Sequence, residues 1–253
     1  MNKLENIQYI YFVGIGGIGM SALARYFNLQ GKKVFGYDKT PSDITKNLIA
    51  EGVSIQFEDD ISKLPSAIKD PENTLVVYTP AIPKSNTIIT WFEKNKYDIL
   101  KRAQLLGEIS KNSICLAVAG THGKTTTSAI LGHLLADCNR SVTAFLGGIS
   151  ENYNSNLICQ GNDLMVVEAD EFDRSFLQLH PDIACITSMD ADHLDIYEDT
   201  SDLEQTFVAF SELLPNSEKL LFKKGLSLKG NSVSSTEDAD FQATNIRIEN
   251  GSY

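Results

Sequence analysis

The stretch VAGTHGKTTT, residues 118–127, combines the residue types that a nucleotide phosphate site requires. Such a site needs backbone amides that converge on oxygens, a lysine beside the terminal phosphates and a hydroxyl on magnesium. The usual loop reads G-x-x-x-x-G-K-[ST]. Here Gly123, Lys124 and Thr125 fit, but Val118 stands where the first glycine belongs. The part from Gly120 onward still supplies all three requirements, which predicts a tighter phosphate loop. The alternative is a glycine turn followed by a surface lysine.

Two acidic stretches follow apolar, strand-like runs further along the chain. In VVEADEFDRSFLQLHP (166–181), Glu168 and Asp170 lie two residues apart and share one face if the strand extends that far. In MDADHLDIY (189–197), Asp192 and His193 follow another strand-like run. Carboxylate and imidazole groups at neighbouring strand ends can bind divalent cations. We therefore predict a metal site that faces the loop, the alternative being solvated acids at strand ends.

Another glycine pattern lies near the N-terminus, in VGIGGIGMSALA. Gly14, Gly16 and Gly19 form G-x-G-x-x-G between a strand-like run and a helix, and Asp38 ends the next strand. Glycines let backbone amides approach a pyrophosphate, and the helix N-terminus adds partial positive charge. The pattern predicts a bound diphosphate without distinguishing NAD from a UDP-sugar. For Asp38, a solvated strand-end carboxylate remains the alternative.

Strand-like runs alternate with helical patterns along the chain, which predicts an α/β fold with mostly parallel sheets. We expect strands at 9–13, 34–38, 74–82, 114–120, 142–148, 164–170, 182–190 and 219–225, and helices near 86–95, 102–111, 124–137 and 201–214. The first strand leads into a helix with Met20, Leu23, Ala24 and Phe27 at helical spacing, and the helix at 124–137 has Ile130, Leu131, Leu134 and Leu135 on one face. The two glycine turns predict two domains, a Rossmann-like parallel-sheet domain over 1–109 and a P-loop ATPase-type α/β domain over 110–253.

The composition narrows the classes of partner. Of the 253 residues, 42% are hydrophobic and 22% are charged, and the net charge of −11 makes nucleic acid and anionic membranes poor partners. The four cysteines are dispersed, with Cys115 and Cys185 in apolar runs, as is typical of reduced thiols in a cytoplasm. The N-terminus has the pattern of a strand rather than of a signal peptide, and no apolar run reaches membrane-spanning length.

Together, GIGGIGMSALA, AGTHGKTTT, EADEFDRSFL and DADHLDIY resemble the Mur ligases, which join a carboxylate to an amine using ATP. The four motifs occur in the family's order and spacing and cover nearly the whole chain. Within the family they are most similar to the member that joins L-alanine to the lactyl carboxylate of UDP-N-acetylmuramate in peptidoglycan synthesis. The resemblance implies a cytoplasmic enzyme that uses ATP and Mg²⁺, with UDP-N-acetylmuramate and L-alanine as the other substrates.

The resemblance also implies roles for individual residues. Lys124, Glu168 and His193 would be catalytic, and Thr125, Glu168 and His193 would hold magnesium. The ATP phosphates would lie against Gly120, Thr121, His122, Gly123, Lys124, Thr125 and Thr126. The UDP-sugar would lie against Gly14, Gly16, Gly17, Ile18, Gly19, Met20, Ser21 and Asp38. One departure concerns the uridine end, because Thr79-Pro80-Ala81-Ile82 replaces the family's frequent Ser-Ser-Ala-Ile and no Asn-Pro-Glu follows.

The family layout adds a third domain that brings the amino acid. This sequence instead ends just after Asn250-Gly251, a hairpin signal with no return strand. We therefore expect a chain that ends inside the central domain and that binds substrates without joining them. Two other functions stay open. One is a ligase that recycles murein tripeptide onto UDP-N-acetylmuramate, and the other is a nicotinamide-dependent oxidoreductase joined to a P-loop module.

Overall fold

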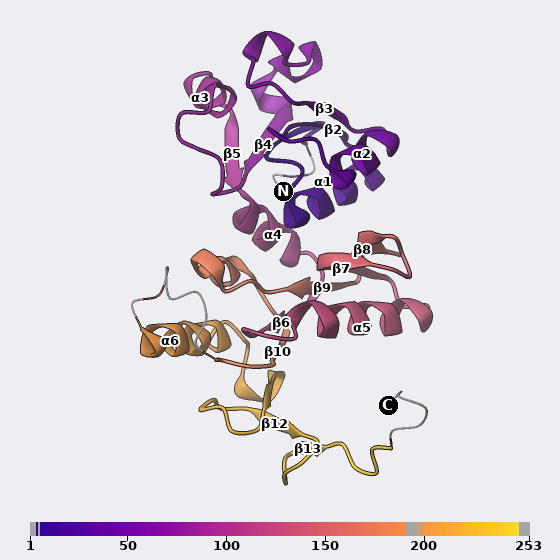
Figure 1. The fold of residues 1–253 in the computed structure, drawn as a ribbon, viewed down its shortest axis with the longest axis vertical. Helices are drawn as coiled ribbons and strands as arrows, with labels where there is room; N and C mark the ends of the chain where they lie inside the picture. Colours follow the sequence, from indigo (N-terminus) through magenta and orange to yellow (C-terminus); the bar gives the residue numbers. More distant parts are fainter. Residues whose placement is uncertain (1–3, 5, 191–196, 198, 248–253) are drawn as a thin grey trace. The chain divides into compact units, whose positions relative to one another are not determined.

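The structure is a computed structural model that describes residues 4, 6–190, 197 and 199–247. Contacts within the chain define two compact units, one of Met1–Glu108 with Phe145–Cys159, the other of Ile109–Ala144 with Gln160–Tyr253. Each unit combines helices with a mostly parallel sheet (Figure 1), which confirms the predicted α/β class. A search of the described residues finds no helix with the length and apolar character needed to cross a membrane.

The first unit is built on a five-stranded sheet of order β3-β2-β1-β4-β5, in which every neighbouring pair is parallel. Its strands are β1 (Tyr9–Val13), β2 (Lys33–Tyr37), β3 (Ser54–Gln56), β4 (Thr74–Tyr78) and β5 (Asp98–Lys101). Its helices are α1 (Ile18–Leu29), α2 (Asp43–Ala50), α3 (Thr87–Lys94) and α4 (Arg102–Ser110), the last of which crosses into the second unit. The strand order reverses between β1 and β4, and ligands of such sheets bind at the carboxyl ends beside this reversal.

The core of this unit explains why β1 is a continuous apolar run. Tyr11 and Phe12 are fully buried although they point to opposite faces of the sheet, as expected for a parallel strand that is covered on both sides. On one face Tyr11 packs against Phe92 of α3, with ring centroids 5.1 Å apart. The predicted residues of α1, including Leu23 and Phe27, are buried as well. Helix α1 is therefore fixed directly after the glycine turn.

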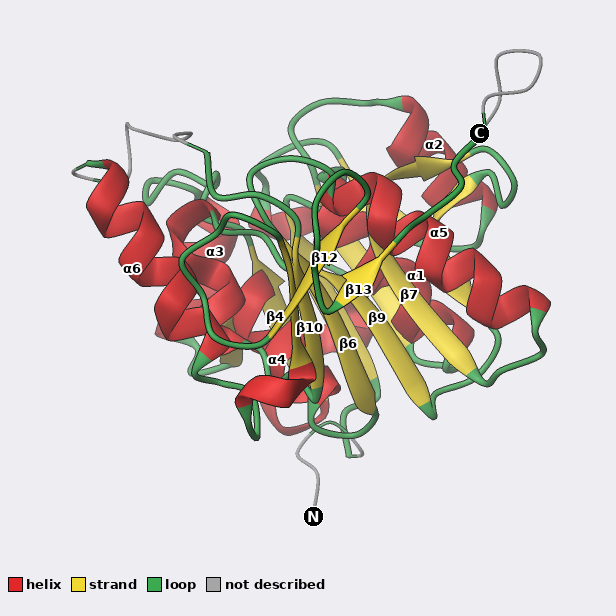
Figure 2. Ribbon diagram, turned by 90° about the horizontal axis from the view of Figure 1, so that it is seen from below, coloured by secondary structure: helices red, strands yellow, loops and turns green. Residues whose placement is uncertain are grey.

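The second sheet has the order β13-β12-β11-β10-β6-β9-β7-β8. Its strands are β6 (Ile114–Ala119), β7 (Val142–Ser150), β8 (Ser155–Cys159), β9 (Leu164–Glu168), β10 (Ile183–Ile186), β11 (Leu220–Lys223), β12 (Asn231–Ser234) and β13 (Phe241–Gln242). The first three residues of β7 belong to the second unit. The rest of β7 and all of β8 belong to the first unit. Helices α5 (Lys124–Asp137) and α6 (Thr200–Ser211) complete the second unit. Figure 2 shows β10, β6 and β9 side by side.

Several sequence-based expectations need correction. Helix α5 does not bury its large apolar face: Ile130 and Leu134 are more than half exposed, while the small residues Ser128, Gly132 and Ala136 are buried. Small side chains let a helix approach its sheet closely, and this close approach decides the buried face. Strands β9 and β10 are shorter than predicted. The Asn250-Gly251 signal lies outside the described residues. All four cysteines are free thiols, as predicted.

Candidate functional site

The phosphate loop follows β6 in the middle of the second unit's sheet. Strand β6 pairs in parallel with β9 on one side and with β10 on the other. Parallel strands end at the same edge of a sheet, so the residues after β9 and β10 meet the loop. Val118 pairs in register with Glu168. The structure thus brings Glu168 to the loop, where the sequence analysis expected it.

Two hydroxyl residues that follow β10 hold the loop in place. The Thr187 hydroxyl, with its single proton, lies within hydrogen-bond distance of the carbonyl oxygens of Ala119, at 3.1 Å, and of His122. Ser188 Oγ accepts from the His122 amide at 2.8 Å and lies 2.9 Å from the Thr121 hydroxyl. The buried Thr121 side chain therefore supports the loop, and the exposed His122 is held through its backbone. The sequence analysis missed Thr187 and Ser188, although two hydroxyls directly after an apolar run were a usable signal.

The helices that follow the two glycine turns begin differently from three of the other helices. Helices α2, α3 and α6 start at Ser42, Asn86 and Asp199, whose side chains accept a hydrogen bond from an amide of the first turn. Helices α1 and α5 instead start at Gly17 and Gly123, with no side-chain cap. Their first-turn amides lie at the positive end of the helix dipole and remain available to an anion.

Lys124 is the first residue of α5 and makes three contacts through its ammonium group. Lys124 Nζ lies 2.6 Å from the Gly120 carbonyl oxygen and 2.9 and 2.8 Å from the two carboxylate oxygens of Glu171. Glu171 is fully buried and Lys124 is 14% exposed. The lysine is therefore part of the loop and not a surface side chain. Glu171, adjacent to the predicted acids, is a third residue that was not predicted from the sequence.

The predicted magnesium ligands partly come together. The Thr125 hydroxyl donates to Glu168 Oε1 at 3.0 Å, so two hard oxygen groups lie side by side next to the loop, as a magnesium site requires. Asp170 lies beyond the end of β9 and instead accepts from the Phe172 amide at 3.1 Å. His193 and Asp192 fall outside the described residues. Within the part of the chain that the structure describes, no group of three or more His, Cys, Asp or Glu residues could by itself hold a metal ion.

The first glycine turn lies at the carboxyl end of β1, at the reversal of strand order. The Gly16 amide donates to Asp38 Oδ2 at 2.7 Å, so Asp38 binds the turn and is more than a solvated acid. The first intrahelical bond of α1 runs from Ser21 N to Gly17 O. Helix geometry therefore leaves the amides ahead of it, those of Ile18, Gly19 and Met20, without an intrahelical acceptor, as the predicted diphosphate site requires.

A buried polar network supports the first turn of α1. Asn156 of β8 is fully buried, and its Nδ2 donates to the Ser21 hydroxyl at 2.9 Å and to the Ile18 carbonyl. Its Oδ1 accepts from the buried Arg25, whose Nε lies 3.0 Å from the carboxylate of Glu51. The Ser21 hydroxyl therefore accepts a hydrogen bond from another residue of the protein, although Ser21 was predicted to contact the UDP-sugar. The sequence offered no signal for this network, because Asn156 lies 135 residues from Ser21.

Arg102, the first residue of α4, lies beside the first turn of α1. A Cβ atom added to Gly19 would overlap its guanidinium group, so the glycine leaves room for the Arg102 side chain at this turn. A guanidinium can bind phosphate through two parallel hydrogen bonds. Arg102 is therefore a further candidate for diphosphate binding, which the sequence analysis missed.

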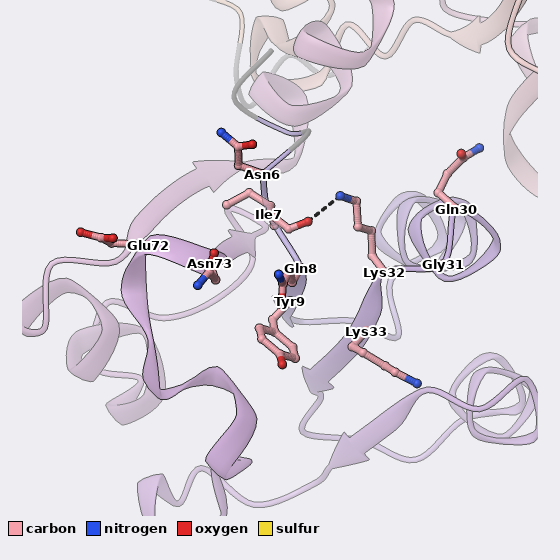
Figure 3. A pocket seen from close by; sticks show the side chains of 10 residues that line it. All are labelled: Asn6, Ile7, Gln8, Tyr9, Gln30, Gly31, Lys32, Lys33, Glu72 and Asn73. Carbon is pink, nitrogen blue, oxygen red and sulfur yellow. Dashed lines mark hydrogen bonds between the residues drawn. The ribbon is translucent and has the colours of Figure 1, made fainter. Parts of the chain in front are cut away.

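A polar cavity of about 860 Å³ lies in the first unit, and Figure 3 shows the residues that line it. Its lining includes Gln8, Lys32 and Asn73, and Lys32 Nζ donates to the Ile7 carbonyl. These residues precede β1, β2 and β4, so the cavity lies at the amino ends of the strands. The glycine turn lies at their carboxyl ends. The cavity is therefore separate from the predicted diphosphate site.

Comparison with known proteins agrees with this geometry. The chain shares 55% identity with a UDP-N-acetylmuramate–L-alanine ligase of Christiangramia forsetii and 58% with one of Flavobacterium psychrophilum. The alignments cover 100% and 99% of this chain but 56% of each relative, so the chain spans about half the length of the curated relatives that it matches.

Two solved structures are similar in fold. The UDP-N-acetylmuramate-alanine ligase of Thermotoga maritima matches with a TM-score of 0.76 at 29% identity, over 86% of this chain and 49% of that one. The UDP-N-acetylmuramate:L-alanyl-gamma-D-glutamyl-meso-diaminopimelate ligase of Neisseria matches with a TM-score of 0.79 at 22% identity, over 90% of this chain and 78% of that one. The second likeness, at this identity, concerns the fold alone.

Two family models match successive parts of the chain. The model described as "Mur ligase family, catalytic domain" matches residues 9–113, which include the first glycine turn. The model described as "Mur ligase middle domain" matches residues 118–246, which include the phosphate loop, Glu168 and Glu171. Since the second match alone spans half of the sequence, and the first precedes it in the family's order, the chain belongs to the Mur ligase family.

Proposed function

We propose that the protein to which this chain belongs is an ATP-dependent ligase that joins L-alanine to the lactyl carboxylate of UDP-N-acetylmuramate. The observation that carries the proposal is the placement of Lys124 at the uncapped start of α5, beside Thr125 and Glu168. The names of the relatives at 55% and 58% identity support the choice of substrates. We place the reaction in the cytoplasm, where ATP and nucleotide sugars are available.

In the proposed reaction the lactyl carboxylate attacks the γ-phosphate of ATP, which releases ADP and forms an acyl phosphate. The amine of L-alanine then attacks the carbonyl carbon, inorganic phosphate leaves, and the nitrogen loses a proton to give the amide. Two anions must meet in the first step, so fixed positive charge is the main requirement. Lys124 and the first-turn amides of α5 supply that charge within a chain whose net charge is −11.

Thr125 and Glu168 would hold Mg²⁺, since their oxygens lie 3.0 Å apart beside the loop. The ion would neutralise phosphate charge when it is bound. His193 stays a predicted ligand from the sequence. In the first unit, the α1 amides and Arg102 would bind the UDP diphosphate, while Asp38 fixes the conformation of the turn through the Gly16 amide.

The two alternative functions have less support. The tripeptide-recycling ligase has a related fold, but at 22% identity that likeness says nothing about the choice of amino acid. The nicotinamide oxidoreductase has only the first glycine turn in its favour, a pattern that serves a UDP-sugar equally well. L-alanine therefore remains the proposed amino acid.

The test is to measure UDP-N-acetylmuramoyl-L-alanine and ADP formed by the full-length protein. We expect Lys124→Ala to lower turnover by about 10²-fold or more, the usual cost of losing a charge-stabilising donor. Lys46→Ala, on an exposed lysine of α2, is the matched control and should leave turnover unchanged. Turnover with the murein tripeptide but not with L-alanine would contradict the proposed substrate, and near wild-type turnover of Lys124→Ala would contradict the role of the loop.

A further inference from the structure

Glu171 carries a fully buried carboxylate that has no role in the reaction proposed above. Both of its oxygens contact Lys124 Nζ, at 2.9 and 2.8 Å, and the Gly120 carbonyl oxygen lies 2.6 Å from the same nitrogen. A lysine ammonium has three protons to donate and no more. The three contacts therefore use the full hydrogen-bonding capacity of Lys124. A phosphate oxygen can bind Lys124 only by replacing one of them.

The backbone that follows Glu171 is strained. Asp173 and Arg174 have φ values of +52° and lie in the left-handed region, which residues other than glycine rarely adopt. Such residues are energetically unfavourable and persist only where the surroundings enforce them. The position of Glu171 is thus maintained against a backbone preference, which points to a function for that position.

Four contacts enforce this turn. The Arg174 amide donates to the Glu171 carbonyl oxygen at 2.9 Å, and the Tyr197 hydroxyl donates to the same oxygen at 2.5 Å. The Arg174 guanidinium lies 5.4 Å from the centre of the Tyr197 ring and forms an ion pair with Asp202 at 2.7 Å. Burial, with a smaller contribution from the Glu171 carboxylate, raises the pKa of Tyr197 to about 12. Its hydroxyl therefore stays protonated and remains a donor at any physiological pH.

We propose that Glu171 is a positioning residue that competes with nucleotide phosphate for Lys124. In the absence of nucleotide the carboxylate holds the ammonium in the loop and balances its charge. A bound phosphate accepts at least one N–H of Lys124 in place of its present partner. The turn at Asp173 and Arg174 meanwhile holds Glu171 within hydrogen-bond distance of the remaining protons. The inference rests on the proposed function, because it assumes that the loop binds nucleotide phosphate.

Removal of the Glu171 charge should strengthen phosphate binding, although most substitutions of buried residues beside a binding site weaken it. Glu171→Gln keeps the shape of the side chain but removes a negative charge within a few ångströms of the phosphate site. Less competition and less repulsion should then strengthen phosphate binding, by about tenfold given the size of charge interactions near a protein surface. A residue that only stabilised the fold would lower the melting temperature and weaken binding instead.

The experiment is isothermal titration calorimetry of magnesium tripolyphosphate into the 253-residue chain. Tripolyphosphate reports on the phosphate site without contributions from adenine. We compare the wild-type chain with Glu171→Gln, and with Glu212→Gln as a matched control on an exposed glutamate at the end of α6. Circular dichroism and thermal melting establish that each variant is folded. The expected result is a dissociation constant about tenfold lower for Glu171→Gln and unchanged for Glu212→Gln.

The outcomes separate the inference from the function on which it rests. A folded Glu171→Gln chain with unchanged or weaker binding overturns the role of Glu171 and leaves the phosphate loop intact. A wild-type chain that binds neither tripolyphosphate nor ATP overturns both. If Glu171→Gln does not fold, Glu171→Asp replaces it, because the shorter side chain cannot keep both contacts with Lys124. We then expect roughly threefold tighter binding, about half the effect of full charge removal on a free-energy scale, and no change would equally refute the proposal.

Discussion

Replacing Gly120 with alanine tests whether the loop depends on the close approach of β10. Gly120 has φ +130°, a conformation that L-residues rarely adopt. An added Cβ would lie 2.8 Å from the Ser188 amide nitrogen and 3.0 Å from that of Thr187, and it would overlap the Thr187 hydroxyl. Since two of these neighbours are backbone atoms of the sheet edge, the loop itself would have to move. Gly225→Ala is the matched control, because Gly225 has φ +98° with nothing within 4 Å of the added Cβ.

The two substitutions share the cost of the backbone conformation and differ in the overlap. The conformational cost is about 1–3 kcal/mol, and overpacking adds about 1–3 kcal/mol. With roughly 2–4 °C of melting temperature per kcal/mol for a chain of this size, the overlap should make Gly120→Ala melt about 2–12 °C below Gly225→Ala. Differential scanning calorimetry measures this difference, and tripolyphosphate titration should show weaker binding for Gly120→Ala alone. Equal melting temperatures and equal affinities in the two variants would refute the reasoning.

Three further predictions concern separate parts of the chain. Gly16→Val should abolish UDP-N-acetylmuramate binding, because a Cβ would lie 2.8 Å from Asp38 Oδ2; unchanged calorimetric affinity would contradict the diphosphate site. Glu168→Gln should raise the magnesium concentration that half-saturates turnover of the full-length protein, since the ion loses a carboxylate; superimposable magnesium titrations would remove Glu168 from the site. Burial raises the pKa of the Cys115 thiol to about 12, so near pH 8 it stays protonated, and a thiol reagent should modify the exposed Cys138 first. Peptide mass mapping that finds Cys115 labelled first would contradict this.

Much of the local architecture follows from the sequence alone. The two glycine turns lie between a strand and a helix as predicted, because an apolar run, a glycine pattern and a helical period are local signals. The buried residues of α1 follow for the same reason. The contact of Thr125 with Glu168 could also be predicted from the sequence, because the carboxyl ends of parallel strands lie at the same edge of a sheet.

The tertiary structure decided which side chains actually meet. Glu168, Asp170 and Glu171 are close in sequence, yet only Glu171 binds Lys124, because β9 ends at Glu168 and the turn after it sets the direction of each side chain. Side chains alternate between the two faces of a sheet only within a strand, so this alternation cannot predict their directions beyond the end of the strand. The contact of Asn156 with Ser21 joins residues 135 positions apart, and the buried face of α5 depends on how closely the helix approaches its sheet. Such contacts arise from packing between distant segments, and no local pattern in a single sequence encodes that packing.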